Sequence, residues 1–506
     1  MYYFLNAFIP RFCSGIEHAE FKRLNNFLAH GVEAKIVTSV YTRDASVNLA
    51  THHLDYAYYV NLYDFFCDNT AVAQRQLQDR DVAPGLRLDV QAEGTHCYDG
   101  TREVMTIRHH DGRIDAVDIY DGDHQLVRRD YYDTRGFKGF SQFFATTDDA
   151  SQAYVALENF YSSTGRVGVE ITYRKRGSGV VATAYRLRRQ DGREWYLMNQ
   201  EQMYTVFLDE LNAGGDTFIS DRSNVTNRPM INMTTPARKL EHFHNIHFQD
   251  YHDPMHSPLT YTSISQTELL SRTDMVITPT AQQAADMQKR LKTTVPIHAI
   301  PVGVVPDAQL AKPPVPEAAR TSGKIIMVAR LYWEKHVDDA IWAFKAAHDQ
   351  LDWLTMDIYG YGDGNTDYRD EKLAKQIVKD QGLSDVVHFM GYTDDIAKVY
   401  DQAQVMLLSS RHEGAPLAIL EAASHGVPTI SYDTHYGPAE LIKAGQSGEI
   451  VPYGDVNGLA DKLVATFGSP QRLSQLSQGA YARAKDYSQE AVWAIWERLV
   501  IHPQAK

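Results

Sequence analysis

Two glutamates in this sequence are spaced so that both could bind one polar ligand. Glu413 and Glu421 are separated by seven small or apolar residues in the stretch RHEGAPLAILEAASHGVPTISYD. Pro416 is well placed as the first residue of a helix, and helical side chains tilt toward the N-terminus, so Glu421 leans toward the loop that holds Glu413. Because carboxylates are good acceptors for vicinal hydroxyls, the pair suits a sugar or a ribose.

Two cations and a run of glycines lie upstream of the glutamates. Arg330 ends a predicted strand and Lys335 follows five positions later, so a rigid bidentate cation and a flexible one could converge on a diphosphate. The exposed amides of the helix start near Pro416 also favour an anion. In DIYGYGDGN, Gly360 follows another strand and permits close backbone approach to a ligand. Taken singly, a solvated loop or an ordinary Gly-rich turn would explain these features. The whole set fits a nucleoside diphosphate joined to a sugar.

The elements around these residues indicate two β/α domains. The strands KIIMVAR, LTMDIYG, VVHFMG, VMLLSS and VPTISYD alternate with helices, and near-continuous apolar strands of this kind are typical of a parallel sheet covered on both faces. At the start of the chain, YYFLNAF and EAKIVTSVY bracket a helical segment that Gly31 can end. Ligands of such sheets bind beyond the carboxyl ends of the strands, so we expect a site in a cleft between the two domains.

A different pattern fills residues 85–200. Short alternating runs such as VMTIRHH and RIDAVDIY are punctuated by Asp-Gly pairs, which predict hairpins with type I′ turns. The pairs are Asp99-Gly100, Asp111-Gly112, Asp121-Gly122 and Asp191-Gly192. We therefore expect an antiparallel β-rich insertion in the first domain.

The predicted domain organisation follows from these patterns and from the Pro-rich stretch PDAQLAKPPVPEAART, which reads as a linker. The ranges are 1–75 and 203–305 for the two parts of an N-terminal Rossmann-like domain, 76–202 for the insertion, 306–323 for the linker, 324–485 for the C-terminal nucleotide-sugar-binding domain, and 486–506 for a C-terminal helix that packs back on the N-terminal domain.

Composition is ordinary for a large globular protein. A chain of 506 residues exceeds what one core normally organises, and it has 43% hydrophobic and 23% charged residues. A formal charge of -14 disfavours nucleic-acid binding. Cys13, Cys67 and Cys97 are too few and too scattered for a disulfide framework or a metal cluster, and the opening residues lack signal-peptide features. We expect cytoplasmic residence, with peripheral association at the inner face of the cell membrane left open.

The E-x7-E spacing, the R-x4-K pair, the IYGYGDG turn and MGYTDDIAKVYDQAQVMLLSSRHEG together resemble the retaining GT-B glycosyltransferases of family four. The sequence is most similar to one branch, the poly(glycerol-phosphate) α-glucosyltransferases of wall teichoic acid and the related catalytic subunit of the paired O-GlcNAc transferases of serine-rich adhesins. SGIEHAE, HFHNIHFQD and DTHYGPAELI extend the resemblance over nearly the whole chain. It implies a GT-B fold, in which two Rossmann-like domains face a cleft and the first carries a β-rich insertion.

The resemblance also implies a role for each matching residue. Glu413 would lie by the donor sugar, Glu421 would hold the ribose hydroxyls, and Arg330 with Lys335 would neutralise the diphosphate. One of the histidines after a strand, His244 or His247, would contact the sugar or acceptor, and we favour His247. The other expected substrate-binding residues are Gly15, Gly360, Tyr392, Gly414, Ala415, Pro416 and Leu417. Gly15 also fits an ordinary strand-to-helix turn. The family transfers a hexosyl group with retention and without a metal, by front-face attack as UDP leaves.

We expect neither a metal nor a cofactor. Five histidines in HFHNIHFQDYHDPMH superficially suggest zinc, but their spacing fits neither a helical His-x3-His pair nor a zinc finger. The segment Asp121-Gly122-Asp123 reads as a hairpin turn and not as a metal-binding Asp-x-Asp motif.

Three functions are compatible with these residues. The leading hypothesis is transfer of glucose from UDP-glucose to poly(glycerol-phosphate), for which YRKRG (173–177) and RLRRQ (186–190) could form a basic acceptor track, although solvated strand faces explain them equally well. The alternative is UDP-GlcNAc-dependent O-glycosylation of a Ser/Thr-rich protein, with a non-catalytic partner. The insertion would be the contact surface of a homo-oligomer or hetero-oligomer. A catalytically silent binding protein is the third hypothesis, and the intact glutamates and cations argue against it.

Overall fold

The computed structural model describes residues 1–145 and 153–503, so short parts of the predicted insertion and C-terminal helix lie outside the described residues. The chain forms two compact units. Unit 1 consists of Met1–Leu24 and Gly31–Leu240, and unit 2 consists of Asn25–His30 and Glu241–Lys506. Residues 241–305, which the sequence places in the N-terminal domain, therefore group with unit 2 by their contacts, while the predicted domain ranges themselves stay predictions.

Unit 1 contains a parallel β-sheet in which β14, β1, β2 and β3 are neighbours in that order. Their bounds are Tyr2–Asn6 (β1), Ala34–Thr38 (β2), Tyr59–Asn61 (β3) and Thr217–Ser220 (β14). The apolar residues of these strands are almost completely buried, as expected for a sheet covered on both faces. The helices that begin in this unit are α1 (Gly15–Ala29), α2 (Ala45–Thr51), α3 (Leu62–Phe66), α4 (Asp79–Val82), α5 (Gln200–Leu211) and α6 (Ser223–Ile231).

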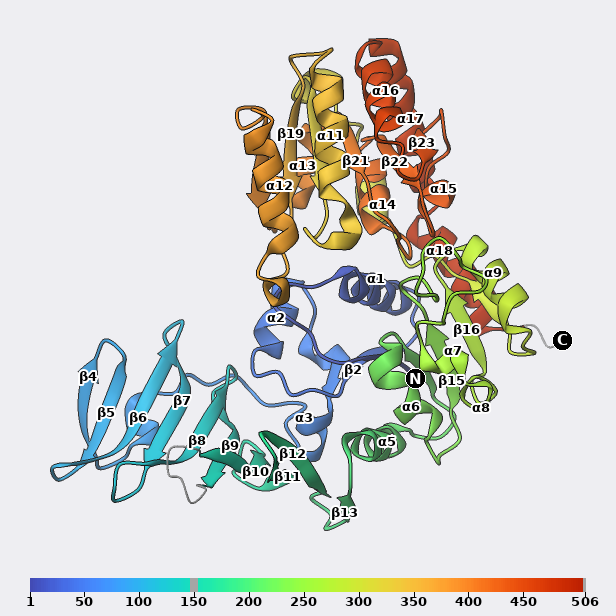
Figure 1. Cartoon of the computed structure of the whole chain (residues 1–506). Helices are drawn as coiled ribbons and strands as arrows, with labels where there is room; N and C mark the ends of the chain where they lie inside the picture. The colour runs from blue at the N-terminus through green and yellow to red at the C-terminus, as the bar shows by residue number, and fades with distance from the viewer. Residues whose placement is uncertain (146–152, 504–506) are drawn as a thin grey trace. The chain divides into compact units, whose positions relative to one another are not determined.

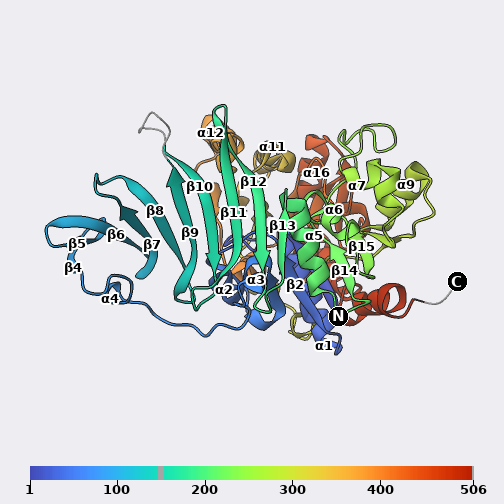
Figure 2. The ribbon, with the colours of Figure 1, turned by 90° about the horizontal axis from the view of Figure 1, so that it is seen from below.

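The insertion is a single antiparallel sheet of ten strands that follow one another in chain order, from β4 at one edge to β13 at the other. Figure 2 shows these strands as one extended layer. Their bounds are Arg87–Gln91 (β4), Gly94–Asp99 (β5), Arg102–His110 (β6), Arg113–Tyr120 (β7), Leu126–Asp133 (β8), Phe137–Ala145 (β9), Tyr154–Tyr161 (β10), Val167–Arg176 (β11), Gly179–Arg188 (β12) and Glu194–Leu197 (β13). The predicted β-rich insertion is confirmed.

The predicted turn type is correct at only one of the four Asp-Gly pairs. Asp111 and Gly112 both have positive φ, of 48° and 70°, as a type I′ turn requires. At residues 99–100 and 191–192 only the glycine has positive φ, and at 121–122 neither residue does. In that last loop Asp121 accepts backbone hydrogen bonds from residues 123 and 125, so its side chain replaces part of the expected turn geometry.

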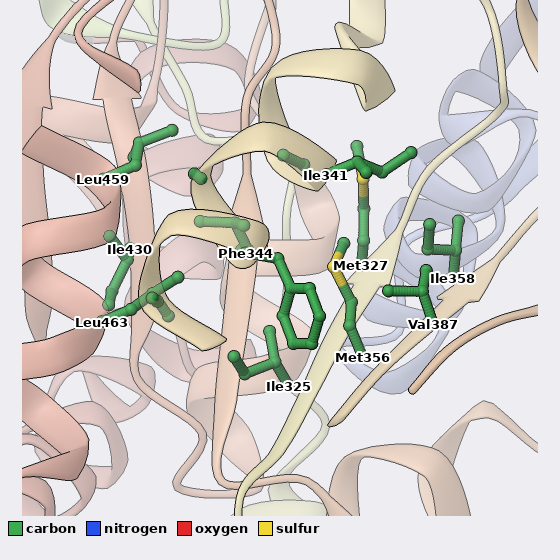
Figure 3. Packing of buried hydrophobic residues seen from close by; sticks show 14 of the residues in the cluster. Ile325, Met327, Ile341, Phe344, Met356, Ile358, Val387, Ile430, Leu459 and Leu463 are labelled. Atoms are coloured by element: carbon green, nitrogen blue, oxygen red, sulfur yellow. The ribbon is translucent and has the colours of Figure 1, made fainter. Parts of the chain in front are cut away.

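Unit 2 contains a six-stranded parallel sheet with the order β20, β19, β18, β21, β22, β23. Figure 1 labels β19, β21, β22 and β23 of this sheet. The strands are β18 (Lys324–Val328), β19 (Thr355–Tyr359), β20 (Val387–Gly391), β21 (Val405–Leu408), β22 (Thr429–Asp433) and β23 (Gly448–Pro452). The connecting helices are α11 (Val337–His348), α12 (Arg369–Asp380), α13 (Ile396–Gln402), α14 (Leu417–Ser424), α15 (Pro438–Leu441), α16 (Val456–Phe467) and α17 (Pro470–Lys485). Phe344 of α11 packs among Ile325, Met327 and Met356 in the core of this sheet (Figure 3).

The rest of unit 2 consists of residues 25–30, residues 241–323 and the C-terminal segment. It includes the parallel pair β16 (Met275–Thr278) and β17 (Ile297–Ala299), and the helices α7 (Thr262–Ser265), α8 (Thr267–Leu270), α9 (Ala281–Leu291), α10 (Asp307–Leu310) and α18 (Gln489–Trp496). Strand β15 (Arg238–His242) crosses the boundary of the units. Trp493 of α18 contacts Phe27 and stacks on His30 at a centroid distance of 4.2 Å. Among the described helices, none has the length and apolar character needed to cross a membrane.

Candidate active site

The candidate residues of unit 2 follow neighbouring parallel strands, at the edge where those strands end. Arg330 follows β18, Gly360 follows β19, Tyr392 follows β20, and Glu413 follows β21. Because all of these strands are parallel, their carboxyl ends lie on the same edge of the sheet. The sheet thus gathers residues that are far apart in the sequence, as predicted.

A part-buried ion pair lies at this edge. The Nζ of Lys335 donates a hydrogen bond to Oε1 of Glu413 at 2.6 Å, and only 15% and 11% of the two side chains are exposed. Burial by itself would raise the pKa of Glu413. The charge and hydrogen bond of Lys335, together with the nearby Ser410 hydroxyl and His412, instead hold that pKa below its ordinary value. Glu413 is therefore an ionised carboxylate at neutral pH.

Arg330 is held apart from this pair by its own partners. Its guanidinium contacts Oε1 of Glu334 at 3.1 Å and lies over the ring of Tyr332 at 4.4 Å. The Arg330 side chain is 40% exposed, so it can accept an anionic ligand from solvent more easily than Lys335 can. That both cations converge on one diphosphate stays a prediction.

Glu421 lies on α14, where the hydroxyl of Tyr400 donates a hydrogen bond to its Oε2 at 3.4 Å. Tyr400 is 1% exposed, so the hydrogen bond holds the Glu421 carboxylate against a buried side chain. Helix α14 begins at Leu417, one residue later than predicted, and Pro416 occupies the N-cap. A common ligand for Glu413 and Glu421 stays a prediction.

Two glycines are required by close packing at the site. Gly360 has a φ of 145°, and a Cβ there would lie 1.8 Å from the carbonyl oxygen of Ala329. A Cβ on Gly414 would lie 2.1 Å from the carbonyl oxygen of His244. The loop that begins helix α14 therefore rests directly on the histidine segment, whose proximity to Glu413 the sequence does not reveal.

The two predicted histidines differ in exposure. His244 is partly exposed, whereas His247 is fully buried. Neither ring nitrogen of His247 has a hydrogen-bond partner among the described residues, and burial, followed by the charge of Arg290, lowers its pKa to about 3. The preference for His247 over His244 as the histidine that contacts a sugar or acceptor stays a prediction.

The remaining predicted residues of unit 2 lie on or next to the loops that follow the strands. Tyr392 is 37% exposed, with its ring 6.1 Å from that of Tyr361. Ala415 and Pro416 pack against Gly437, where an added Cβ would lie 3.0 Å and 2.7 Å from them. Leu417 begins α14.

Gly15 belongs to unit 1, where it begins helix α1 beside a buried polar network. In this network Asn6 donates to Glu17 at 3.1 Å, the hydroxyl of Ser14 donates to Glu17 at 2.7 Å, and Arg222 is ion-paired with Glu17. The predicted contact of Gly15 with phosphates stays a prediction.

Several residues of the site are not identified by the sequence analysis. Tyr436, Asp286 and Tyr251 contact the Glu413 loop or its neighbours, and they come from three separate segments. Two stretches contained a signal: DTHYGPAELI includes Tyr436, and HFHNIHFQDYHDPMH includes Tyr251. Within unit 2, His336, Asp338 and Asp339 place possible ligand atoms within 4.8 Å of one another, but Asp339 already accepts a hydrogen bond from Tyr432.

Comparisons with known proteins define the class. The family described as Glycosyl transferases group 1 matches residues 311–483. The chain is 25% identical to the UDP-N-acetylglucosamine--peptide N-acetylglucosaminyltransferase GtfA subunit of Limosilactobacillus reuteri subsp. suis, over 98% of both chains. It is 27% identical to the poly(glycerol-phosphate) alpha-glucosyltransferase of Bacillus subtilis, over 34% of this chain and 25% of the relative.

Solved structures extend the similarity of the fold to the whole chain. The pneumococcal O-GlcNAc transferase GtfA, in complex with UDP and GlcNAc, has a TM-score of 0.82 at 22% identity, over 98% of this chain and 97% of the other. A TarM structure from S. aureus has a TM-score of 0.79 at 17% identity, over 98% of each chain. A GtfA/B complex has a TM-score of 0.81 at 22% identity, over 99% of each chain.

Residues 311–483 thus form a group 1 glycosyltransferase domain within a GT-B fold. The whole chain has the GT-B fold, and it is similar both to the O-GlcNAc transferase branch and, over about a third of its length, to the poly(glycerol-phosphate) glucosyltransferase branch.

Proposed function

We propose that this protein is a retaining, metal-independent hexosyltransferase that uses a UDP-sugar as donor. The observation that carries the proposal is the part-buried Lys335–Glu413 pair at the carboxyl edge of the parallel sheet. Charged groups withdrawn from solvent are costly to maintain unless they are paired, and ionisable groups with shifted pKa values cluster at functional sites.

In the proposed mechanism the positive groups stabilise the leaving UDP. Arg330, Lys335 and the amides at the start of α14 would receive the diphosphate, while Glu421 would hold the ribose hydroxyls and Glu413 would face the donor sugar. The bond between the sugar C1 and the phosphate oxygen breaks, and a bond from C1 to the acceptor oxygen forms on the same face. The acceptor proton passes to the departing phosphate oxygen, so charge stabilisation on UDP supplies the main catalytic effect.

The first candidate acceptor is poly(glycerol-phosphate), with UDP-glucose as donor. The hairpin of β11 and β12 supports it, because Arg174 and Arg176 have no carboxylate partner among the described residues. The second predicted basic stretch gives less support, since Arg186 and Arg188 are both ion-paired with Glu194. Similarity to the Bacillus subtilis enzyme also favours this candidate, over about a third of the chain.

The second candidate is transfer of N-acetylglucosamine from UDP-GlcNAc to a Ser/Thr-rich protein. It is favoured by the relative that matches 98% of the chain. Because the chain is similar to a GtfA/B complex, we propose that this second function requires a partner subunit. We propose that the partner docks on the ten-stranded insertion.

Purified protein incubated with UDP-glucose or UDP-GlcNAc, crossed with poly(glycerol-phosphate) or a Ser-rich peptide, tests the proposal through UDP release. We expect one donor and one acceptor to give release well above the donor-only rate. UDP release that requires an added partner subunit would favour the Ser/Thr-rich protein as the acceptor. Absence of both UDP binding and UDP release in every combination would refute the proposed function.

A further inference from the structure

Tyr436 is a fully buried tyrosine in the loop after β22, and both its backbone and its side chain connect to the candidate site. The backbone N–H of Glu413 donates to the carbonyl of His435 at 2.8 Å, and the N–H of Tyr436 donates back to the carbonyl of Glu413. This reciprocal pair of hydrogen bonds fixes the backbone that carries the Glu413 carboxylate.

The side chain of Tyr436 reaches a different part of unit 2. Its hydroxyl donates a hydrogen bond to Oδ2 of Asp286, on α9, at 2.9 Å. Its ring lies parallel to that of His247, with a centroid distance of 6.1 Å and an angle of 9°, and meets the ring of Phe248 edge-on. One residue therefore touches the Glu413 loop through its backbone and the 247–286 segment through its side chain.

Two further contacts join the region around the Glu413 loop to the segment that contains residues 251–282. The guanidinium of Arg411 donates a hydrogen bond to the hydroxyl of Tyr251 at 2.9 Å. The carboxylate of Glu440 accepts from the backbone N–H groups of residues 281 and 282, at the start of α9. Charge-assisted hydrogen bonds of this kind are stronger than neutral ones, and carboxylates are favoured at helix N-termini.

We propose that Tyr436 is a positioning residue that fixes the Glu413 loop against the segment carrying His244 and His247, with Asp286 as its anchor. This inference rests on the proposed function, because it assigns Tyr436 a role in that same reaction. Tyr436 has no exposed surface and its hydroxyl is engaged by Asp286, so it acts through Glu413 and not on the substrate. Displacements of about 1 Å in such a support can cost about 100-fold in rate.

The chain offers a matched control in Tyr432. It is equally buried, and its hydroxyl donates to Oδ2 of Asp339 at the same distance, 2.9 Å. Tyr432→Phe therefore removes the same kind of hydrogen bond from the same unit. In both variants a partly exposed carboxylate loses its tyrosine donor, so the loss of stability should be similar, about 1–3 kcal/mol.

The experiment compares Tyr436→Phe with Tyr432→Phe. We expect Tyr436→Phe to lower kcat by at least about tenfold, with the KM for the donor and the affinity for UDP within about twofold of wild type. Asp286→Ala should reproduce this loss, and the Tyr436→Phe/Asp286→Ala double variant should be no worse than the poorer single variant. Tyr432→Phe should keep wild-type kcat. Equal kcat losses in the two tyrosine variants, or wild-type kcat in Tyr436→Phe, would overturn the proposal.

A second readout does not depend on catalysis. Because the Glu413 N–H bonds to His435, amide hydrogen exchange in a peptide covering residues 410–417 should speed up in Tyr436→Phe and stay unchanged in Tyr432→Phe. Unchanged exchange in Tyr436→Phe would reject the positioning role. Failure of the wild-type protein to bind UDP or release it from any donor would instead reject the proposed function, while the exchange result would still decide the role of Tyr436.

Discussion

The Nζ of Lys335 and Oε1 of Glu413 are 2.6 Å apart, although 78 residues separate them in the chain. The two residues follow different strands of one parallel sheet, which brings them together at its carboxyl edge. Because both side chains are largely withdrawn from solvent, removal of either one leaves the other without its charged partner.

Lys335→Ala is expected to lower kcat by about 100-fold, since a cation that strengthens its contact as charge develops on UDP acts mainly in the transition state. The matched control is Lys324→Ala, which removes another part-buried pair, with Asp357 at 2.7 Å, at the start of β18. Both variants should lose stability in urea unfolding, but only Lys335→Ala should lose turnover. Near wild-type turnover in Lys335→Ala would exclude it from the mechanism.

The same variant changes the titration of Glu413. In the wild-type protein the pKa of Glu413 is lowered, so the stabilisation from the pair is present above the unfolded pKa of about 4.3 and is lost as pH falls through the folded pKa. Without the charge and hydrogen bond of Lys335 to oppose burial, that pKa should rise. We expect the acid limb of the pH–rate profile to move to higher pH in Lys335→Ala, and an unmoved limb would show that Glu413 does not control it.

Glu421→Ala should chiefly raise the KM for the donor, because ribose binding is similar in the ground and transition states. Loss of hydrogen bonds to a charged group corresponds to roughly 10- to 100-fold in KM. Glu421→Gln keeps the size and one acceptor oxygen, so its KM should lie between wild type and Glu421→Ala. Initial-rate kinetics over a range of donor concentrations measure this. A collapse of kcat at constant KM would contradict the ribose assignment.

Gly360→Ala is expected to destabilise unit 2 by more than about 2 kcal/mol, because its Cβ would lie 1.8 Å from the Ala329 carbonyl at a φ of 145°. Gly364→Ala is the control from the same glycine run, since its nearest neighbour, the Tyr368 hydroxyl, would be 3.5 Å away. The control should stay within about 0.5 kcal/mol of wild type. Urea unfolding midpoints of the two variants give the comparison. Similar midpoints would argue against close packing of Gly360 on the Ala329 carbonyl.

His247 should remain neutral between pH 5 and 8, since burial and the nearby charge of Arg290 lower its pKa to about 3. In the unfolded chain it titrates near 6.5, so its contribution to stability is complete above that pH and falls by about 1.4 kcal/mol per pH unit as pH drops toward 3. His247→Gln should flatten the pH dependence of the unfolding free energy in this window. An NMR titration that gives His247 an ordinary pKa would contradict the prediction.

Activity should survive excess EDTA, because in the proposed mechanism Arg330, Lys335 and the start of α14 neutralise the diphosphate without a divalent ion. UDP release with EDTA, and again after adding magnesium or manganese, measures this. A loss of more than about tenfold, or roughly 1.4 kcal/mol of barrier, that metal restores would overturn the assignment of Glu413 and Glu421 to sugar and ribose. The His336, Asp338 and Asp339 group would then be the first metal site to test.

The sequence by itself determined the elements of this protein and the residue types of its site. Apolar strands alternating with helices predicted the parallel sheets, and the alternating runs with Asp-Gly pairs predicted the antiparallel insertion, because these patterns depend on local periodicity. The turn types were mostly wrong, since the backbone angles at residues 121–122 depend on the side chain of Asp121 and not on the Asp-Gly pair alone.

Only the tertiary structure decided the partners and exposure of those residues. The ion pair of Lys335 with Glu413, the hydrogen bond of Tyr436 with Asp286 and the burial of His247 all join segments that are distant in the chain. Sequence periodicity shows which face of an element is apolar, but it does not specify which distant side chain packs against that face. That choice depends on how the strands are ordered and how closely the loops after them pack, as at Gly414 and the His244 carbonyl.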